Sequence, residues 1–503
     1  MNELTEFMSP QEAWDELLSE RNTYIRRHKA AYSGLHMELT ATAFQDSFWN
    51  RHGKAKIHVP LAADMAAVSS DLLFGNAPRC KIYDDSKESE EDDKQNRLDQ
   101  ILRGSKFESL LQEAAETAAV IGDIYLKCNW DSKALPCPSI CYVSGEDAVP
   151  EYRFAKLVCV HFFTIIKQDR KTGRIWRLYE RYEPGHIWSM VYTGDTGTLG
   201  AETPSGLEVY GVEEHVAVPG GGMLAVHIAN MKPSRVREQH YGRSEFEGMR
   251  DMLDSLDEAW SSWMRDIRLA KARIIVPQEY LRPRNSEEGG GGGQMFTDNK
   301  YTFEFDEDVE VYVALDIAND KNMTITPSQF AIRSAEHAAT VESLIRNIIS
   351  MGGYSPQTFG LDINGQATSG TALLIREKKT YQMRSKKLNY WSEPLESFLT
   401  AVLHLDAEVY HIPNVHPEDR VIVEFPDSMS TDISTMAQAV QMMHNAQAVS
   451  VRTAIKMLHP DWEDGQIEEE AERCMQEFGT PDPSAIAEEG DLHPDQDQED
   501  GDA

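Results

Sequence analysis

The chain has 503 residues, of which 41% are hydrophobic and 26% are charged, a balance typical of a folded protein and not of a disordered one. This length exceeds what one hydrophobic core usually fills, so we expect two or more structural regions. The formal net charge of -34 argues against tight, sequence-independent binding of nucleic acid, because such binding depends on many Lys and Arg side chains.

The sequence shows no clear secretion signal, membrane segment or disulfide pattern. The first 20 residues alternate acidic and apolar side chains and lack the basic stretch and apolar core of a secretion signal. The most apolar stretch, Leu157 to Ile166, is about half as long as a membrane helix. The six cysteines show no framework spacing. We therefore expect a protein of the cytosol with reduced thiols and no membrane segment.

The first part of the chain is predicted to be helical. Apolar residues recur at helical spacing among charged ones, with Ser9 as a cap and Pro10 at the first helical position. An acidic run from Asp84 to Arg97 indicates a solvated loop. The expected helices cover Pro10 to Leu39, Pro60 to Leu73 and Leu98 to Val120.

From Asp123 to Ile228 the pattern changes to short β-rich runs separated by turn residues. Such spacing predicts several antiparallel hairpins. The expected strands cover Ile124 to Cys128, Leu157 to Ile166, Ile175 to Tyr182, His186 to Tyr192 and Leu207 to Val212.

Three long helices and a small β region are predicted next. Ser244 and Glu247 fit a capping box at the start of the first helix, and Pro394 should kink the third. The helices are expected from Ser244 to about Ala272, from Pro327 to about Ser350 and from Thr371 to about Leu405. Strands are expected between the first two helices at Arg273 to Val276, Tyr301 to Phe305 and Val309 to Leu315.

The stretch from Met351 to Gly370 has no periodicity and is rich in glycine. A loop of about 20 residues inside a folded chain is usually functional or disordered. Beyond the third helix we expect a strand at Val421 to Phe425 and helices at Ser434 to Asn445, Val451 to Leu458 and Asp464 to Phe478. After Gly479 there is no Lys or Arg, which predicts a disordered acidic tail.

Two motifs could indicate bound groups, and neither fits well. Five consecutive glycines, Gly289 to Gly293, are followed by Gln294 and Met295, whereas a phosphate-binding loop needs Lys and then Ser or Thr; we expect a flexible tip. A zinc site is conceivable on ligand count in the β-rich region, but the spacing is not that of a zinc knuckle, so ordinary thiols are favoured. The residues concerned are Cys128, Cys137, Cys141, Cys159 and His161. We expect no metal and no cofactor.

The charge balance reverses between Thr371 and Tyr390, where six basic residues stand against the single Glu377. A solvated helix face would explain this segment in isolation. Its position directly after a glycine-rich loop, in so acidic a chain, also allows a surface that faces a polyanion. The basic residues are Arg376, Lys378, Lys379, Arg384, Lys386 and Lys387.

The order of parts and the wording of two junctions resemble the portal proteins of tailed double-stranded-DNA bacteriophages, particularly those of long-tailed phages. One junction is Tyr241 to Phe246, which leads into the first long helix, and the other is Gly365 to Ala372, which leads into the basic helix. The resemblance extends from about residue 10 to residue 478.

The resemblance implies an α+β fold built from named regions. It implies a mixed α/β wing (1–240 with 406–430), two stem helices (241–272 and 327–350), a small β-rich clip (273–326), a tunnel loop (351–370), a kinked spine helix (371–405), a helical crown (431–478) and an acidic tail (479–503).

The resemblance also implies function and partners. Portal proteins form closed rings, dodecameric in the virion, at one capsid vertex, and DNA passes through the ring during packaging and ejection. Assembly in the host cytoplasm is implied, with the large terminase of the packaging motor, head-tail connector proteins, and major capsid and scaffolding proteins as partners.

On this interpretation the duplex is bound only weakly, because an acidic channel wall keeps it mobile while a few basic side chains steady it. The basic helix would supply the steadying contacts. The DNA-facing residues of the tunnel loop would be Tyr354, Gln357, Thr358, Phe359 and Asn364.

Two other classes of protein remain as alternatives. Another structural ring or connector protein of a virion is possible, although connectors are typically much shorter. A packaging ATPase or nuclease would need a phosphate-binding loop or clustered acidic metal ligands at strand ends, and neither is visible. We therefore expect no enzymatic activity.

Overall fold

The structure is a computed structural model that describes residues 7–33, 56–83, 91–238, 240–270, 273–277, 312–315, 326–328, 332–361, 370–412, 415–426, 437, 440–443, 446, 448–459, 462 and 464–477. Contacts divide the chain into two units. The larger unit contains Met1–Gly365 and Arg376–Pro426, and the smaller contains Gln366–Ile375 and Asp427–Ala503.

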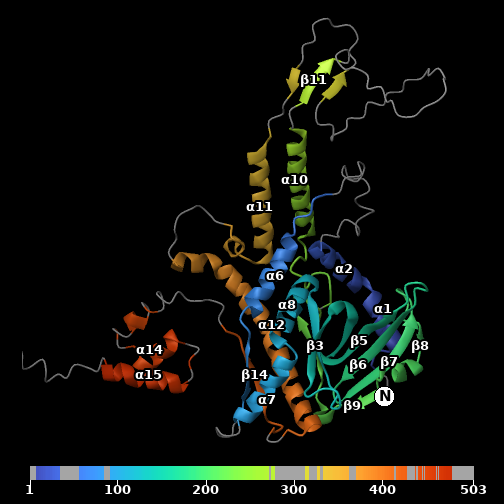
Figure 1. The fold of residues 1–503 in the computed structure, drawn as a ribbon, viewed down its shortest axis with the longest axis vertical. Helices are drawn as coiled ribbons and strands as arrows, with labels where there is room; N and C mark the ends of the chain where they lie inside the picture. Colours follow the sequence, from blue (N-terminus) through green and yellow to red (C-terminus); the bar gives the residue numbers. More distant parts are fainter. Residues whose placement is uncertain are drawn as a thin grey trace, which may run out of the picture. The chain divides into compact units, whose positions relative to one another are not determined.

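In the described residues of the first part of the larger unit, five helices precede the β-rich region (Figure 1). Ser9 caps the first of them in a capping box, in which its backbone N–H donates to Glu12 Oε2 at 2.7 Å, so this start signal is confirmed. The helices are α1 (Pro10–Leu18), α2 (Glu20–Ser33), α6 (Leu61–Phe74), α7 (Glu91–Gly104) and α8 (Phe107–Ile121).

Three boundaries in this region differ from the prediction. Helix α7 begins at Glu91, inside the expected acidic loop, because Lys94 is buried and its Nζ lies 3.0 Å from Asp419 Oδ2, far along the chain. The helix expected from Leu98 to Val120 is interrupted between α7 and α8, where Lys106 has a φ of 50°. Similarly, the single helix expected from Pro10 is divided at Ser19 into α1 and α2.

The β-rich region forms two sheets, and the predicted antiparallel hairpins are confirmed within them. The three-stranded sheet has the order β10-β2-β3, and the larger sheet has the order β4-β5-β6-β7-β8 with β9 also paired to β7. The strands are β2 (Asp123–Asn129), β3 (Ser139–Ser144), β4 (Ala148–Arg153), β5 (Lys156–Gln168), β6 (Ile175–Glu183), β7 (His186–Gly194), β8 (Ala201–Glu202), β9 (His215–Ala217) and β10 (Ala225–Ala229). Trp14 of α1 packs edge-on against Phe163 of β5, so α1 covers one face of the larger sheet.

The strand predicted at Leu207 to Val212 is wrong, because the segment forms a short helix, α9 (Ser205–Tyr210). Gly206 lies so close to Val191 of β7 that a Cβ atom there would come within 2.8 Å of Val191 Cγ1. Gly211, with a φ of 65°, ends the helix. Packing against β7 therefore decides the local conformation.

Two long helices, α10 (Arg250–Leu269) and α11 (Ser334–Gly352), lie side by side, with β11 beyond their ends (Figure 1). Strand β11 (Arg273–Pro277) pairs in parallel with β12 (Tyr312–Leu315) and antiparallel with β13 (Thr326–Ser328). Two long helices joined by a small β unit are thus confirmed. The expected strand Tyr301 to Phe305 and the five glycines lie outside the described residues.

Helix α12 (Gly370–Tyr410) is the third long helix and contains Pro394, as predicted. Its second half supplies Trp391, Leu395 and Phe398 to the largest hydrophobic core, beside residues of α8, β2 and β10. Strand β14 (Arg420–Glu424) then pairs antiparallel with β1 (Arg79–Tyr83). The chain thus returns to its N-terminal part.

The smaller unit contains α14 (Val451–Leu458) and α15 (Asp464–Glu477), which pack through Ile455, Ile467 and Ala471. Both helices are confirmed. The helix expected at Ser434 to Asn445 lies mostly outside the described residues, and the acidic tail lies wholly outside them. Among the described residues, no helix is both long and apolar enough to cross a membrane.

Candidate functional site

The first half of the glycine-rich segment is ordered. Gly353, with a φ of 93°, ends α11, and a Cβ atom at this position would clash with the Met383 side chain of α12. A 3-10 turn, η4 (Pro356–Phe359), follows and ends at Gly360, whose φ is 72°. The expectation of a segment without structure is therefore wrong for residues 351–361, while residues 362–369 lie outside the described part of the chain.

Tyr354 is an internal anchor of this segment. Its side chain is 1% exposed, and its hydroxyl donates to Glu245 Oε1 at 2.9 Å. Burial raises the pKa of Tyr354 well above its usual value, so the phenol stays neutral and keeps its proton for this hydrogen bond. Tyr354 is not available to DNA in this chain, and the prediction for this residue is corrected.

Lys387 of α12 lies at the centre of the same contacts. Its ammonium donates to Glu245 Oε1 and Ser69 Oγ, and it lies 3.2 Å from the Tyr354 hydroxyl. Burial, together with nearby Arg243, lowers the pKa of Lys387 well below its usual value. We call Ser69, Glu245, Tyr354 and Lys387 the junction network, because it joins α6, the segment before α10, the glycine-rich segment and α12.

Further contacts hold the segment against α12. The backbone N–H of Ser355 donates to Thr380 Oγ1 at 2.9 Å, and the hydroxyls of Thr358 and Thr380 are also 2.9 Å apart. The rings of Tyr354 and Phe359 meet edge to face at 5.9 Å. Gln357, Thr358 and Phe359 are half-buried, so each retains some surface open to solvent.

The basic residues of α12 divide into buried and exposed groups. Arg384 is buried and donates to the carbonyl oxygens of Leu72 (2.7 Å) and Pro426 (2.6 Å). Arg384 and Lys387 therefore hold the chain together, and the prediction that they face DNA is corrected. The exposed group consists of Lys378, Lys379 and Lys386, of which Lys379 also donates to Ser350.

Two predicted DNA-facing residues have no described side chain. Asn364 lies outside the described residues, and only the helical backbone of Arg376 is described. Their roles stay predictions.

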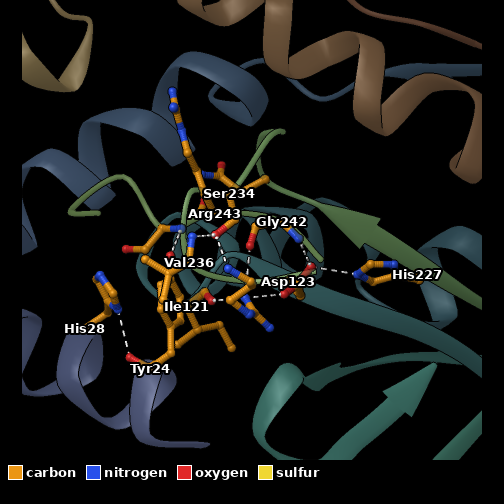
Figure 2. A network of polar contacts seen from close by, with 12 residues as sticks. Tyr24, His28, Ile121, Asp123, His227, Ser234, Val236, Gly242 and Arg243 are labelled. Carbon is orange, nitrogen blue, oxygen red and sulfur yellow. Dashed lines mark hydrogen bonds and ion pairs between the residues drawn. The ribbon is translucent and has the colours of Figure 1, made fainter. Parts of the chain in front are cut away.

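A second network fixes the segment that leads into α10, and sequence reasoning missed it (Figure 2). Fully buried Asp123 accepts hydrogen bonds from the backbone N–H of Gly242 (2.6 Å) and from His227 Nε2 (2.7 Å), and it pairs with Arg237 Nη1 at 2.7 Å. Burial acts to raise the pKa of Asp123, but Arg237 and His227 together lower it to about 2. Asp123 is therefore a charged anchor.

The neighbouring contacts of Tyr24 and Glu247 complete this attachment. Tyr24 donates to Glu247 Oε2 at 2.7 Å and accepts from the Ser244 backbone N–H at 2.9 Å. Glu247 also accepts from Ser234 Oγ (2.8 Å) and from the Arg235 backbone N–H (2.7 Å). The predicted capping box is therefore wrong: these long-range donors occupy Glu247, and α10 begins only at Arg250.

Both networks hold the same segment, the residues between β10 and α10, against the rest of the larger unit. The second network fastens the residues between β10 and α10 to α2 and β2. The junction network fastens them to the segment after α11 and to the middle of α12, and Lys387 extends it to α6. The arrangement offers rigid support beneath exposed lysines and half-buried polar groups.

Comparison with curated proteins finds no match. Among solved structures the chain is similar to one described as the neck of an empty GTA particle computed with C6 symmetry, with a TM-score of 0.46 and 12% identity over 82% of this chain and 93% of that chain. It is also similar to one described as the neck of a native GTA particle computed with C12 symmetry, with a TM-score of 0.43 and 12% identity over 83% of this chain and 92% of that chain.

The family comparison covers most of the chain and agrees with the resemblance seen in the sequence. The matching family model is described as "Phage portal protein, SPP1 Gp6-like", and the match extends over residues 20–477. The chain belongs to this family of phage portal proteins.

Proposed function

We propose that the chain is a portal subunit that assembles with copies of itself into a closed ring, with twelve subunits in the virion, at one vertex of a capsid. Double-stranded DNA would pass through the ring during packaging and ejection. Membership of the portal family carries this proposal. The long helices α10 and α11 support it, because helices standing side by side can supply the head-to-tail interfaces that a closed ring requires.

Each region of a portal subunit can be assigned to particular elements of this chain. Residues 1–240 with 406–430 form the wing, and the pairing of β1 with β14 supports this grouping. Helices α10 and α11 form the stem, and the sheet of β11, β12 and β13 forms the clip that would dock the packaging motor and the head-tail connector. Residues 351–370 form the tunnel loop, α12 the spine, and 431–478 the crown.

The contact with DNA is assigned to the exposed lysines of α12 and to the loop. Lys378, Lys379 and Lys386 are exposed, while Gln357, Thr358 and Phe359 are partly so. Arg376 and Asn364 stay in the proposed set on their positions alone. Because the chain carries a net charge of -34, a few lysines can steady the duplex without a large gain from counterion release. Weak binding is what a sliding polymer requires.

Electron microscopy of the purified chain tests the ring. We expect closed rings with a central hole, and a protein that stays monomeric at every concentration and salt condition would overturn the proposal. The family is structural, and we propose that the chain has no catalytic activity of its own. ATP hydrolysis by the purified chain alone would contradict that part.

A paired substitution tests the DNA contact. Lys378→Gln combined with Lys386→Gln removes two exposed charges from α12, whereas Lys133→Gln combined with Lys171→Gln removes two exposed charges from turns of the β-rich region. We expect both variants to form normal rings, and only the first to reduce the amount of DNA packaged into particles assembled with the variant. Equal packaging by the two variants would refute the assignment of these lysines to the channel.

A further inference from the structure

Three side chains with metal-binding atoms meet on one face of the larger sheet. Glu151 of β4 pairs directly with Cys159 of β5, and His161 follows two residues later on the same face. One ligand atom from each of the three lies within 4.8 Å of the others, and all three residues are buried. The register between two strands therefore brings together a carboxylate, a thiol and an imidazole.

The distance between the sulfur and the nitrogen matches one edge of a metal tetrahedron. Cys159 Sγ lies 3.5 Å from His161 Nε2, and His161 Nε2 lies 3.7 Å from Glu151 Oε2. A tetrahedral zinc ion with bonds of about 2.3 Å to sulfur and about 2.0 Å to nitrogen separates those two ligand atoms by roughly 3.5 Å. A small cation can thus bind between these atoms with little rearrangement.

Outer contacts already orient the ligands. His161 Nδ1 lies 2.9 Å from the Tyr179 hydroxyl, which leaves Nε2 directed toward Cys159 and Glu151. Glu151 accepts from the Met8 backbone N–H at 3.1 Å and from Arg153 at 3.0 Å. Partners of this kind fix the ring and carboxylate of metal ligands in proteins.

The charges of the ligands fit a divalent cation. The Glu151 carboxylate brings one negative charge, and a metal ion that binds Cys159 displaces the thiol proton to solvent, so that the thiolate brings a second. Two nearby guanidiniums oppose a cation, yet Arg153 pairs with Glu151, and Arg181 lies 3.5 Å from Glu183.

We propose that Glu151, Cys159 and His161 bind one zinc ion, with a water molecule as the fourth ligand. A thiolate combined with an imidazole selects zinc over magnesium or calcium, which prefer sets of oxygen ligands. Phe7, whose ring lies against Arg153 and Arg181, and Met8, whose N–H donates to Glu151, lie beside the site in the segment before α1. Zinc binding therefore fastens the N-terminal segment to the sheet.

Metal analysis of the full-length chain tests the proposal. After expression with zinc and dialysis against metal-free buffer, we expect one zinc per chain by mass spectrometry. Cys159→Ser and His161→Ala should each lose most of it. Cys141→Ser, which changes a cysteine of neighbouring β3, should keep one zinc per chain. Equal zinc in all four proteins would overturn the proposal.

A variant that fails to fold would lose zinc for a trivial reason. Cobalt substitution avoids this problem, because the experiment uses the native chain. Cobalt added to the metal-free native protein should produce the charge-transfer absorption of a thiolate ligand, with release of protons. Native protein without stoichiometric zinc and without this absorption would exclude the site. Neither readout depends on ring assembly or DNA packaging, so a failure here is separate from a failure of the portal proposal.

Discussion

At the scale of single residues, the buried contact between Lys387 and Glu245 is the most consequential polar interaction of the loop region. Both side chains are almost fully buried, and each is a partner of Tyr354. Removing one partner of a buried hydrogen bond leaves the other unsatisfied, which typically costs about 1–3 kcal/mol and more where that group is charged.

Lys387→Met should therefore lower the melting temperature of the purified protein strongly. Lys386→Met is the matched control, because it removes the adjacent lysine, which is exposed. Scanning calorimetry of the two variants provides the comparison. If both melt together with the native protein, the junction network does not stabilise the chain.

The lowered pKa of Asp123 makes the stability of the folded protein depend on pH. Its pKa is about 2 in the folded protein and about 3.9 in an unfolded chain, so its stabilising contribution is complete above pH 4 and is lost as the pH falls toward 2. Asp123→Asn should lower the melting temperature at pH 7, and the gap from the native protein should narrow between about pH 4 and pH 2.

The control for this effect is Asp131→Asn, which changes an exposed carboxylate in the turn after β2. We expect a small difference from the native protein at every pH. Melting curves recorded across the pH range test both variants. A gap for Asp123→Asn that is constant with pH would show that the carboxylate charge is not what stabilises this segment.

At the scale of elements, the end of α11 depends on close packing against α12. Gly353 and Gly360 both have a positive φ, which costs a residue with a Cβ atom roughly 1–2 kcal/mol. A Cβ atom at Gly353 would also clash with Met383, whereas one at Gly360 would meet nothing within 4 Å.

Gly353→Ala should therefore destabilise the protein more than Gly360→Ala, although both substitutions strain the backbone. Thermal unfolding measures the difference, and Gly353→Ala combined with Met383→Ala should recover part of it. Equal losses for the two single variants would mean that the contact with α12 contributes nothing to the end of α11.

The elements also show where sequence reasoning succeeded. Helices α10, α11 and α12 have amphipathic or apolar patterns long enough to be recognised locally, and strands such as β5 and β6 lie between clear turns. The predicted kink at Pro394 and the domain labels stay predictions. Boundaries failed where a distant residue decided them, as Tyr24 does for Ser244 and Asp419 does for Lys94.

The candidate site was only partly predictable for the same reason. Charge counting found the basic segment of α12, but it could not separate the exposed Lys386 from the buried Lys387, because Glu245 and Ser69 come from other elements. Likewise Cys159 and His161 are close in sequence, whereas the strand register that adds Glu151 is a tertiary property. Local pattern identifies candidates, and packing selects among them.

At the scale of the whole molecule, the acidic composition predicts weak retention of DNA. A chain with a net charge of -34 cannot gain much from releasing phosphate counterions. Purified rings should leave duplex DNA unshifted in gel assays at physiological salt and retain it only at low ionic strength. Tight binding with a steep dependence on salt would contradict this view of the channel.

The hydroxyl of Tyr354 has a mechanical consequence for the segment that follows α11. It is bonded to Glu245, directly before the residues that enter α10, and Lys387 clamps the same carboxylate from α12. A displacement of the segment that contains Tyr354 is therefore resisted from two sides, by the chain that enters α10 and by α12, which leads toward the paired strands β1 and β14. Both attachments converge on a single shared carboxylate.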